Sequence, residues 1–491
     1  MYLNKQKIGP PIIYILLFLF VFTCNKQWTD QEIAVISATH FSHSKSGYPE
    51  NTMAILFNSQ KRLWPPRPFI CVSNNGTHVF AELAKIRYAF EPIYICRWAT
   101  YIMTCPVVGI PNGFALSDTR FSSATIQVPY RQAVEQRLGV VACFSPLFYN
   151  ERWQLIIPTL EIYRQLGVDV QVFYIQSMLT DIMDYMKVYE RLNIIKINTW
   201  NMIRLDPAKE RKLGYDPNAE LEWRNQATAH TDCFIHYKQA AEFIIISDID
   251  DILFPKLGDT YLEEFRRLSV TFPQGAGFSY SRYNTELIAS KSAQDYSLAS
   301  LLNSARIANE WEDGKYVVRP EFIETVWLHW PGIMDSNHKM YAVDEEINIM
   351  VHMRNWSIID YSYNTNHKTS KTFELFKYQI SDVIQPQMTH DLERNFRRFL
   401  RLYAQKEFDR LPNEVRYYPL IEECYNRIFY GRSKRPESCP GPLRCDLPKV
   451  EGLRCSIARK VYEHDSMNTK VKIHFARDGG DFVVSYNGCT M

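Results

Sequence analysis

Three acidic residues near the middle of the chain have the types and the spacing that bind a divalent metal ion. Asp248 and Asp250 are separated by Ile249, and Asp251 follows directly. In an extended segment Asp248 and Asp250 point to the same side, because side chains alternate along a strand. Carboxylates packed this closely repel one another unless a cation lies between them, and their oxygens suit hard ions such as Mn²⁺ or Mg²⁺.

The chemistry of such a site is Lewis-acid catalysis at a phosphate group. A metal ion held by carboxylates typically bridges to a substrate diphosphate and neutralises the charge that develops when a nucleoside diphosphate leaves. We therefore expect Asp248, Asp250 and Asp251 to be catalytic. Asp250 is the best candidate metal ligand, and Asp248 would reach the metal or a ribose.

Two aspartates separated by one residue are a weak signal when they are considered alone. A solvated acidic turn or an acidic cluster at a helix start would have the same pattern. A phosphatase of the haloacid dehalogenase type also carries two such aspartates, but on the first strand of its domain and with a small or hydroxyl residue after them. Here several strand–helix units come first, and Ile252 follows the acidic residues.

The segments before the aspartates predict the elements that must position them. Buried strands are expected over residues 139–145, 168–175, 194–200 and 243–247, and helices over residues 150–166, 180–192 and 224–240. This alternation predicts an α/β fold with a parallel sheet and helices on both of its faces. Ligands of such sheets bind at the carboxyl ends of the strands, and the aspartates follow the last of these strands.

The N-terminus has the composition of a secretory targeting segment. Lys5 and Lys7 precede an apolar run over residues 12–24. The run is shorter than the ~20 residues of an ordinary membrane-spanning helix. A short signal-anchor is favoured, because the end of the run lacks the small-x-small pattern of a signal-peptide cleavage site. A cleaved signal peptide is the alternative. With the basic flank left in the cytoplasm, the bulk of the chain would face the lumen.

The cysteine count agrees with a lumenal protein. The chain has 11 cysteines, and Cys24 lies in the apolar run, so an even number follows it. An even number in an oxidising compartment favours disulfides. The cluster from Cys424 to Cys489 indicates a C-terminal region stapled by such bonds.

Composition and charge limit the classes of partner. Lys and Arg number 56, Asp and Glu number 54, and the formal net charge is +2. Nucleic-acid binders usually carry a basic excess, so no nucleic-acid partner is expected. We divide the chain into residues 1–27 (cytoplasmic tail and signal-anchor), 28–135 (a small β-rich lumenal domain), 136–375 (the α/β domain) and 376–491 (a helical, disulfide-stapled region).

Several ordered motifs between residues 139 and 354 resemble a known family. They are Cys143-Phe144-Ser145-Pro146-Leu147 with Trp153, Gly167 with Val172-Phe173-Tyr174, Gln226 with Asp232-Cys233, Ser247-Asp248-Ile249-Asp250-Asp251 with Pro255, Arg319-Pro320 with Val326 and His329, and His352-Met353-Arg354. Together they are similar to glycosyltransferase family 92, a group expanded in nematodes and long labelled domain of unknown function 23.

The resemblance implies a fold, a reaction and a location. It implies a GT-A-like, Rossmann-type fold and β-galactosyltransferase activity, with UDP-galactose as donor, Mn²⁺ or Mg²⁺ as cofactor and inversion at the anomeric carbon. The acceptor would be a glycan on a glycoprotein or glycolipid. The protein would be a single-pass type II protein of the Golgi membrane, or a secreted one if the N-terminal segment is cleaved.

The resemblance also suggests roles for individual residues. A late histidine commonly joins Asp248 and Asp250 at the metal, with His329 as the first candidate and His352 as the second. Arg354 could contact the diphosphate, because a guanidinium matches phosphate oxygens. The nucleotide pocket would be lined from the set Cys143, Ser145, Gln226 and Asp232. Asp232 could equally fix a helix end, and Cys143 and Cys233 are either a disulfide or buried thiols.

An inverting enzyme needs a general base for the acceptor hydroxyl, and the sequence singles out none. Candidates in the expected half of the chain are Glu321, Asp335 and Glu346, with Glu324, Asp344 and Glu345 nearby. Met353 and Asn225 depart from the family pattern, which has an aromatic residue and a glycine there. The alternative is therefore a catalytically inactive lumenal protein of the same fold that binds glycans or nucleotide sugars.

Overall fold

The computed structural model describes residues 31–43, 46–61, 68–118, 125–360, 365–368, 373–430, 438–467, 471–477 and 479–490. The predicted signal-anchor lies outside these residues. Across the part of the chain that is described, no helix combines the length and the apolar character needed to span a bilayer.

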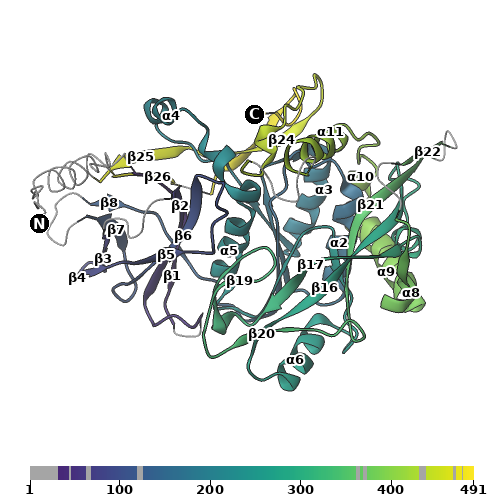
Figure 1. The fold of residues 1–491 in the computed structure, drawn as a ribbon, viewed down its shortest axis with the longest axis horizontal. Helices are drawn as coiled ribbons and strands as arrows, with labels where there is room; N and C mark the ends of the chain where they lie inside the picture. Colours follow the sequence, from purple (N-terminus) through teal and green to yellow (C-terminus); the bar gives the residue numbers. More distant parts are fainter. Residues whose placement is uncertain are drawn as a thin grey trace, which may run out of the picture.

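A parallel, Rossmann-type half lies at the centre of the molecule (Figure 1). Its strands are β10 (Leu138–Phe144), β11 (Val170–Ile175), β13 (Ile195–Thr199) and β14 (Ala241–Ser247), in the spatial order β13-β11-β10-β14. The first strand of this half in chain order, β10, therefore lies between later strands on both sides. Ligands bind at the carboxyl ends of the strands at such a switch point.

Helices cover both faces of this half, as the sequence predicts. They are α2 (Trp153–Gln165), α3 (Thr180–Arg191) and α5 (Gln226–Tyr237). On β10, Ala142 and Phe144 face the core that contains α2 and α3, whereas Val141 and Cys143 face the core that contains α5. Burial on both faces explains why most residues of β10 and β14 are apolar, whereas the edge strand β13 carries the exposed Lys196.

Beyond β14 the sheet is mixed. β17 (Arg306–Val318) pairs antiparallel with β14, followed by β16 (Gly275–Ser290), β21 (Met350–Asp360) and β15 (Asp251–Leu253). β20 (Lys339–Ala342), β22 (Thr365–Lys368) and β23 (Phe376–Gln379) pair at its margins. The expected α/β, GT-A-like class is confirmed. The sheet has parallel pairs in the β13-β11-β10-β14 half and again where β16 pairs with β20 and β21.

The N-terminal part is rich in strands, as expected. One sheet contains β1 (Gln31–Phe41), β2 (Thr52–Gln60), β6 (Trp98–Pro106) and β5 (Lys85–Tyr88), and another contains β3 (Ile70–Asn74), β4 (Val79–Leu83), β7 (Gly113–Ser117) and β8 (Ile126–Gln127). Phe41 and Leu56 also share a core with α5, so this part packs against the parallel half.

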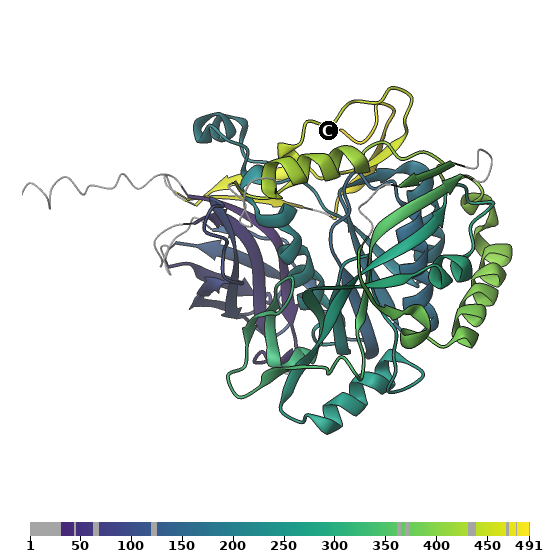
Figure 2. The same cartoon turned by 45° about the vertical axis from the view of Figure 1, so that its right-hand side comes forward.

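The C-terminal region begins with helices and ends with strands. The helices include α9 (Pro386–Phe399), α10 (Gln405–Phe408) and α11 (Tyr418–Tyr425). The strands are β24 (Cys455–Arg459), β25 (Tyr462–Ser466), β26 (Val471–Ala476) and β27 (Asp481–Ser485). Thus only the first part of this region is helical. β26 pairs with β1 and β24 with β12 (Ser177–Leu179), and Figure 2 shows the yellow C-terminal strands reaching the purple N-terminal ones.

All ten cysteines after the N-terminal segment form disulfides. The pairs are Cys71–Cys105, Cys96–Cys439, Cys143–Cys233, Cys424–Cys445 and Cys455–Cys489. The prediction of a disulfide-stapled C-terminal region is confirmed. Cys143 and Cys233 are bonded to each other and tie β10 to α5, so the alternative of buried thiols is excluded.

Candidate active site

The acidic residues lie at the carboxyl edge of the parallel half. Asp248 and Asp250 occupy the turn after β14, and Asp251 opens the short strand β15. β15 pairs with β21 so that Asp251 lies opposite His352, and Met353 N–H donates to the backbone oxygen of Asp250 over 2.7 Å. This pairing explains how a histidine about a hundred positions later comes to lie beside the aspartates.

Asp248 is held by polar groups on three elements. Ser145, at the end of β10, donates to its Oδ1, and so does Gln226 Nε2 at the start of α5, over 2.6 Å. Lys315 Nζ of β17 lies 2.8 Å from Oδ2. Burial disfavours the charged form of Asp248, but Lys315 and the hydrogen bonds outweigh it and hold its pKa well below the usual range.

Asp250, Asp251 and His352 bring together three side chains of the types that hold a metal ion. Their side-chain ligand atoms all lie within 4.8 Å of one another. His352 Nδ1 donates to Asn284 Oδ1 over 2.8 Å, which leaves Nε2 facing Asp250 Oδ2 at 3.5 Å. A ligating histidine is commonly oriented in this way through its second nitrogen. Two carboxylates and one imidazole are a donor set that fits Mn²⁺, so these residues are the ones that would hold it.

Basic side chains of the protein itself surround the acidic ones. Arg282 lies 3.3 Å from Asp251 and 2.8 Å from Glu312, and Arg354 lies 2.7 Å from Glu312. Burial lowers the pKa of His352, but Asp250 and Asp251 raise it to about 9. The repulsion between the carboxylates, from which the sequence predicts a metal ion, is therefore already offset in part by the chain's own cations.

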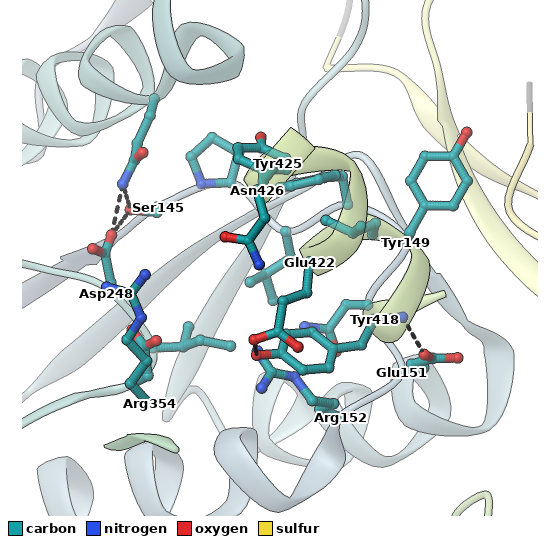
Figure 3. Close-up of a pocket in the computed structure, with 18 residues that line it drawn as sticks. Ser145, Tyr149, Glu151, Arg152, Asp248, Arg354, Tyr418, Glu422, Tyr425 and Asn426 are labelled. Carbon is teal, nitrogen blue, oxygen red and sulfur yellow. Dashed lines mark hydrogen bonds between the residues drawn. The ribbon is translucent and has the colours of Figure 1, made fainter. Parts of the chain in front are cut away.

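A pocket with a volume of about 360 Å³ opens beside these residues (Figure 3). It is bounded by the segment after β10, by the turn after β14, by Arg354 and by α11. Its lining comprises residues 145–152, Gln226, Asp248, Ile249, Asp250, Arg354, Tyr418, Ile421, Glu422, Tyr425 and Asn426. Of the predicted nucleotide-binding residues, Ser145, Gln226 and Arg354 line this pocket.

Two other predicted nucleotide-binding residues lie away from the pocket lining. Cys143 is in its disulfide within β10. Asp232 is in α5, where its carboxylate accepts hydrogen bonds from Arg131 and from the Tyr174 hydroxyl, each over 2.6 Å. These contacts fix the helix to neighbouring elements, which is the structural alternative that the sequence left open for Asp232.

His329 lies apart from the cluster of Asp250, Asp251 and His352. It occupies the turn between β18 (Ile323–Val326) and β19 (Pro331–Met334). Its Nδ1 lies 2.9 Å from the backbone oxygen of Gly314 and its ring contacts two tryptophans. Burial lowers the pKa of His329 to about 4, so the ring is neutral at physiological pH.

The candidate bases lie elsewhere. Glu321, Glu324 and Asp335 line a separate cavity that also contains Lys238, the residue after α5 at the opposite end of β14 from Asp248. Glu345 accepts a hydrogen bond from the Tyr283 hydroxyl over 2.6 Å, and Glu346 is exposed. None of these carboxylates lines the pocket beside Asp248.

Several residues of the site were missed by sequence reasoning. Lys315, Arg282 and Glu312 come from β16 and β17, and Glu422 from α11. A lysine next to an apolar strand segment was a usable signal for Lys315, because a buried ammonium requires a charged or hydrogen-bonding partner. Glu422 carries no comparable signal, since it lies in a helix beyond the motifs.

The two departures from the family pattern are accommodated by the structure. Asn225 has a φ of 62°, in the left-handed region that glycine favours and that asparagine tolerates best among other residues. Its amide Nδ2 donates to Asn58 Oδ1 over 2.7 Å, and Asn58 donates back over 3.1 Å. Met353 is buried in the main core.

The switch point, the acidic turn at its edge and the adjoining pocket define a GT-A-like class of protein. Comparison with known proteins gives the family. The model of Glycosyltransferase family 92 matches residues 139–399, and the chain therefore belongs to glycosyltransferase family 92. Membership identifies it as a glycosyltransferase, an enzyme class that takes a sugar from a nucleotide-sugar donor to an acceptor.

Two relatives that match over most of their length are also members of glycosyltransferase family 92. The chain is 32% identical to glycosyltransferase family 92 protein F59C6.8 of Caenorhabditis elegans, over 94% of this chain and 89% of the relative. It is 30% identical to family 92 protein F13G3.3 of the same organism, over 93% of this chain and 90% of the relative. The similarity thus extends beyond the segment that the family model matches, to the N-terminal strands and the C-terminal region.

Proposed function

We propose that this glycosyltransferase moves galactose from UDP-galactose to a glycan acceptor, with bound Mn²⁺ or Mg²⁺ and with inversion to a β-linkage. One observation carries the metal dependence. The ligand atoms of Asp250, Asp251 and His352 converge within 4.8 Å, and Asp250 also lines the pocket. A bound ion would supply Lewis-acid stabilisation for the departing nucleoside diphosphate.

The chain's own residues would add orientation and charge. Ser145 and Gln226 fix the Asp248 carboxylate in one position, so it needs no rearrangement during reaction. The Arg354 side chain is 54% exposed and lines the pocket, so its guanidinium can meet a diphosphate there through paired N–H groups.

The choice of galactose and of inversion rests on the motif resemblance to the family. A donor panel tests it. The full chain would be incubated with Mn²⁺, a set of glycan acceptors, and UDP-galactose, UDP-glucose, UDP-N-acetylglucosamine or GDP-fucose in turn, and nucleoside diphosphate release would be measured. We expect release from UDP-galactose and a β-linked product by NMR. Release from another donor, or an α-linked product, would refute the corresponding part of the proposal. UDP binding without turnover would favour an inactive binding protein.

We also propose a lumenal location in the Golgi, with a type II membrane anchor in residues 1–27 or secretion after its cleavage. The five disulfides support an oxidising compartment. In intact microsomes, a C-terminal epitope tag should resist added protease until detergent is added. Digestion of the tag without detergent would contradict this topology.

A further inference from the structure

The C-terminal helix α11 forms one wall of the pocket. Tyr418, Glu422 and Tyr425 of this helix line the cavity, together with Asn426 that follows it. The family model ends at residue 399, so this wall lies outside the matched segment. Figure 3 shows Glu422 and Asn426 projecting from the helix into the cavity, on the side that faces Asp248 and Arg354.

The position of this wall is fixed at both ends of the helix. The buried carboxylate of Glu151 accepts hydrogen bonds from the backbone N–H groups of Arg416, Tyr417 and Tyr418, over 2.7 to 2.9 Å. Cys424, near the end of α11, is bonded to Cys445. The pocket therefore has a preorganised wall rather than a loose tail.

Glu422 presents a carboxylate with spare hydrogen-bonding capacity. The Tyr418 hydroxyl donates to its Oε1 over 3.4 Å, and the Tyr418 ring is in turn covered by the Arg152 guanidinium at 3.5 Å from the ring centroid. Among the described residues, Oε2 of Glu422 has no hydrogen-bond or ion-pair partner. A carboxylate only accepts hydrogen bonds, so its ligand must donate.

The other carboxylates of the pocket are already engaged. Asp248 is bound by Ser145, Gln226 and Lys315, and Asp250 lies with His352. Both oxygens of Glu151 are used by α11. Glu422 is therefore the carboxylate of this lining that is left to bind a substrate group.

We propose that Glu422 recognises a vicinal diol of the nucleotide-sugar donor, either of its ribose or of its transferred sugar. Two adjacent hydroxyls present two donors, which match the two oxygens of one carboxylate. A diphosphate would be repelled by Glu422, so the anionic part of the donor belongs nearer to the Arg354 guanidinium, which also lines the pocket. This inference rests on the proposed use of a nucleotide-sugar donor.

Binding of UDP and of UDP-galactose, each with Mn²⁺, tests the inference by calorimetry on the full chain. Glu422→Gln and Glu422→Ala would be compared with the unaltered protein, and Glu423→Gln, an exposed neighbour outside the lining, is the matched control. We expect Kd to rise about tenfold or more in both Glu422 variants and to stay unchanged in the control, since hydrogen bonds to a charged group are strong. A raised Kd for UDP itself would show that Glu422 binds the ribose diol. A raised Kd for UDP-galactose alone would show that it binds the diol of the transferred sugar.

Unchanged Kd values for both ligands in both Glu422 variants would overturn the inference. Lost transfer with unchanged donor binding would also overturn it, because Glu422 would then act on the acceptor. Failure of the unaltered chain to bind either ligand with Mn²⁺ would instead refute the proposed function, so the two failures can be told apart. Unchanged melting temperatures would verify that the variants are folded.

Discussion

At the residue scale, the buried charged side chains of the candidate active site are paired with side chains of opposite charge. Asp248 is matched by Lys315, Asp251 by Arg282, and Glu312 by Arg282 and Arg354. Removing one partner of such a pair leaves an uncompensated buried charge, which costs more than the pair itself contributes. The network therefore fixes the geometry of the site, and it makes each of its members sensitive to substitution.

Glu222 differs, because it is buried with a neutral partner. It is 7% exposed, and Trp327 Nε1 donates to its Oε1 over 2.7 Å. Burial raises the pKa of Glu222 from 4.5 to about 7, against the opposing effect of this hydrogen bond. Because the folded protein holds the Glu222 proton more tightly than the unfolded chain, this proton adds to the free energy of unfolding. The contribution is fully present below pH 4.5 and is lost as the pH rises through 7.

We therefore predict that Glu222→Gln removes this pH dependence. At pH 4 the variant and the unaltered protein should have similar free energies of unfolding. At pH 8 the variant should be more stable by about 3 kcal/mol, because it avoids a buried charge and keeps an oxygen for Trp327. Urea titrations at both pH values measure the difference in free energy of unfolding between the variant and the unaltered protein. Other titrating groups contribute equally to both proteins, so their effects cancel in this difference. A difference that does not change with pH would contradict the assignment.

At the element scale, local patterns were sufficient for the parallel half and insufficient for the pocket. The strands β10, β11 and β14 were marked by short apolar runs, and α2 by apolar residues at helical spacing, so the type and order of these elements were predictable. The sequence also predicted correctly that Asp248 and Asp250 follow β14 at the carboxyl edge of the parallel strands. His352 reaches them only through the β15–β21 pairing, and α11 only through contacts with Glu151, and no local pattern encodes such contacts.

The Glu151 contact with α11 leads to a prediction about the pocket wall. Glu151→Gln replaces one accepting oxygen by a donor that opposes the backbone N–H groups of Arg416, Tyr417 and Tyr418. We expect faster hydrogen exchange at these amides, a free energy of unfolding lower by about 2 kcal/mol, and weaker donor binding. Hydrogen-exchange mass spectrometry measures the first effect.

The matched control for this prediction is Glu414→Gln. Glu414 is exposed and pairs with the side chain of Arg416 rather than with the helix backbone. The Glu414→Gln substitution should leave hydrogen exchange of the backbone amides at the start of α11 unchanged. Equal protection in the Glu151 variant would show that the helix is held by its other contacts.

At the scale of the whole molecule, the two ends of the described chain are interlocked. β26 pairs in parallel with β1, and the buried His474 lies 2.8 Å from Glu32. The Cys96–Cys439 disulfide joins positions 343 residues apart. The sequence predicted that cysteines pair but could not predict these partners, because pairing across such separations depends on the complete fold.

We predict that the paired substitution Cys96→Ser with Cys439→Ser destabilises the whole protein. The disulfide restricts a very long loop in the unfolded chain, and its loss should lower the free energy of unfolding by about 2–5 kcal/mol. Urea unfolding followed by both tryptophan fluorescence and circular dichroism measures this loss. If only the C-terminal region unfolded earlier, with the main transition unchanged, the bond would act locally and the prediction would be wrong.

We propose that Asp250 and its neighbours support metal-dependent transfer from UDP-galactose. Asp250→Asn tests it most directly, and Asp259→Asn is the control, because Asp259 is an exposed residue in the segment after β15. UDP release would be measured with and without Mn²⁺ for the unaltered chain and both variants. We predict UDP release that requires Mn²⁺, falls about a hundredfold or more in Asp250→Asn and is unchanged in Asp259→Asn. Release that is independent of Mn²⁺, or that survives in Asp250→Asn, would contradict it.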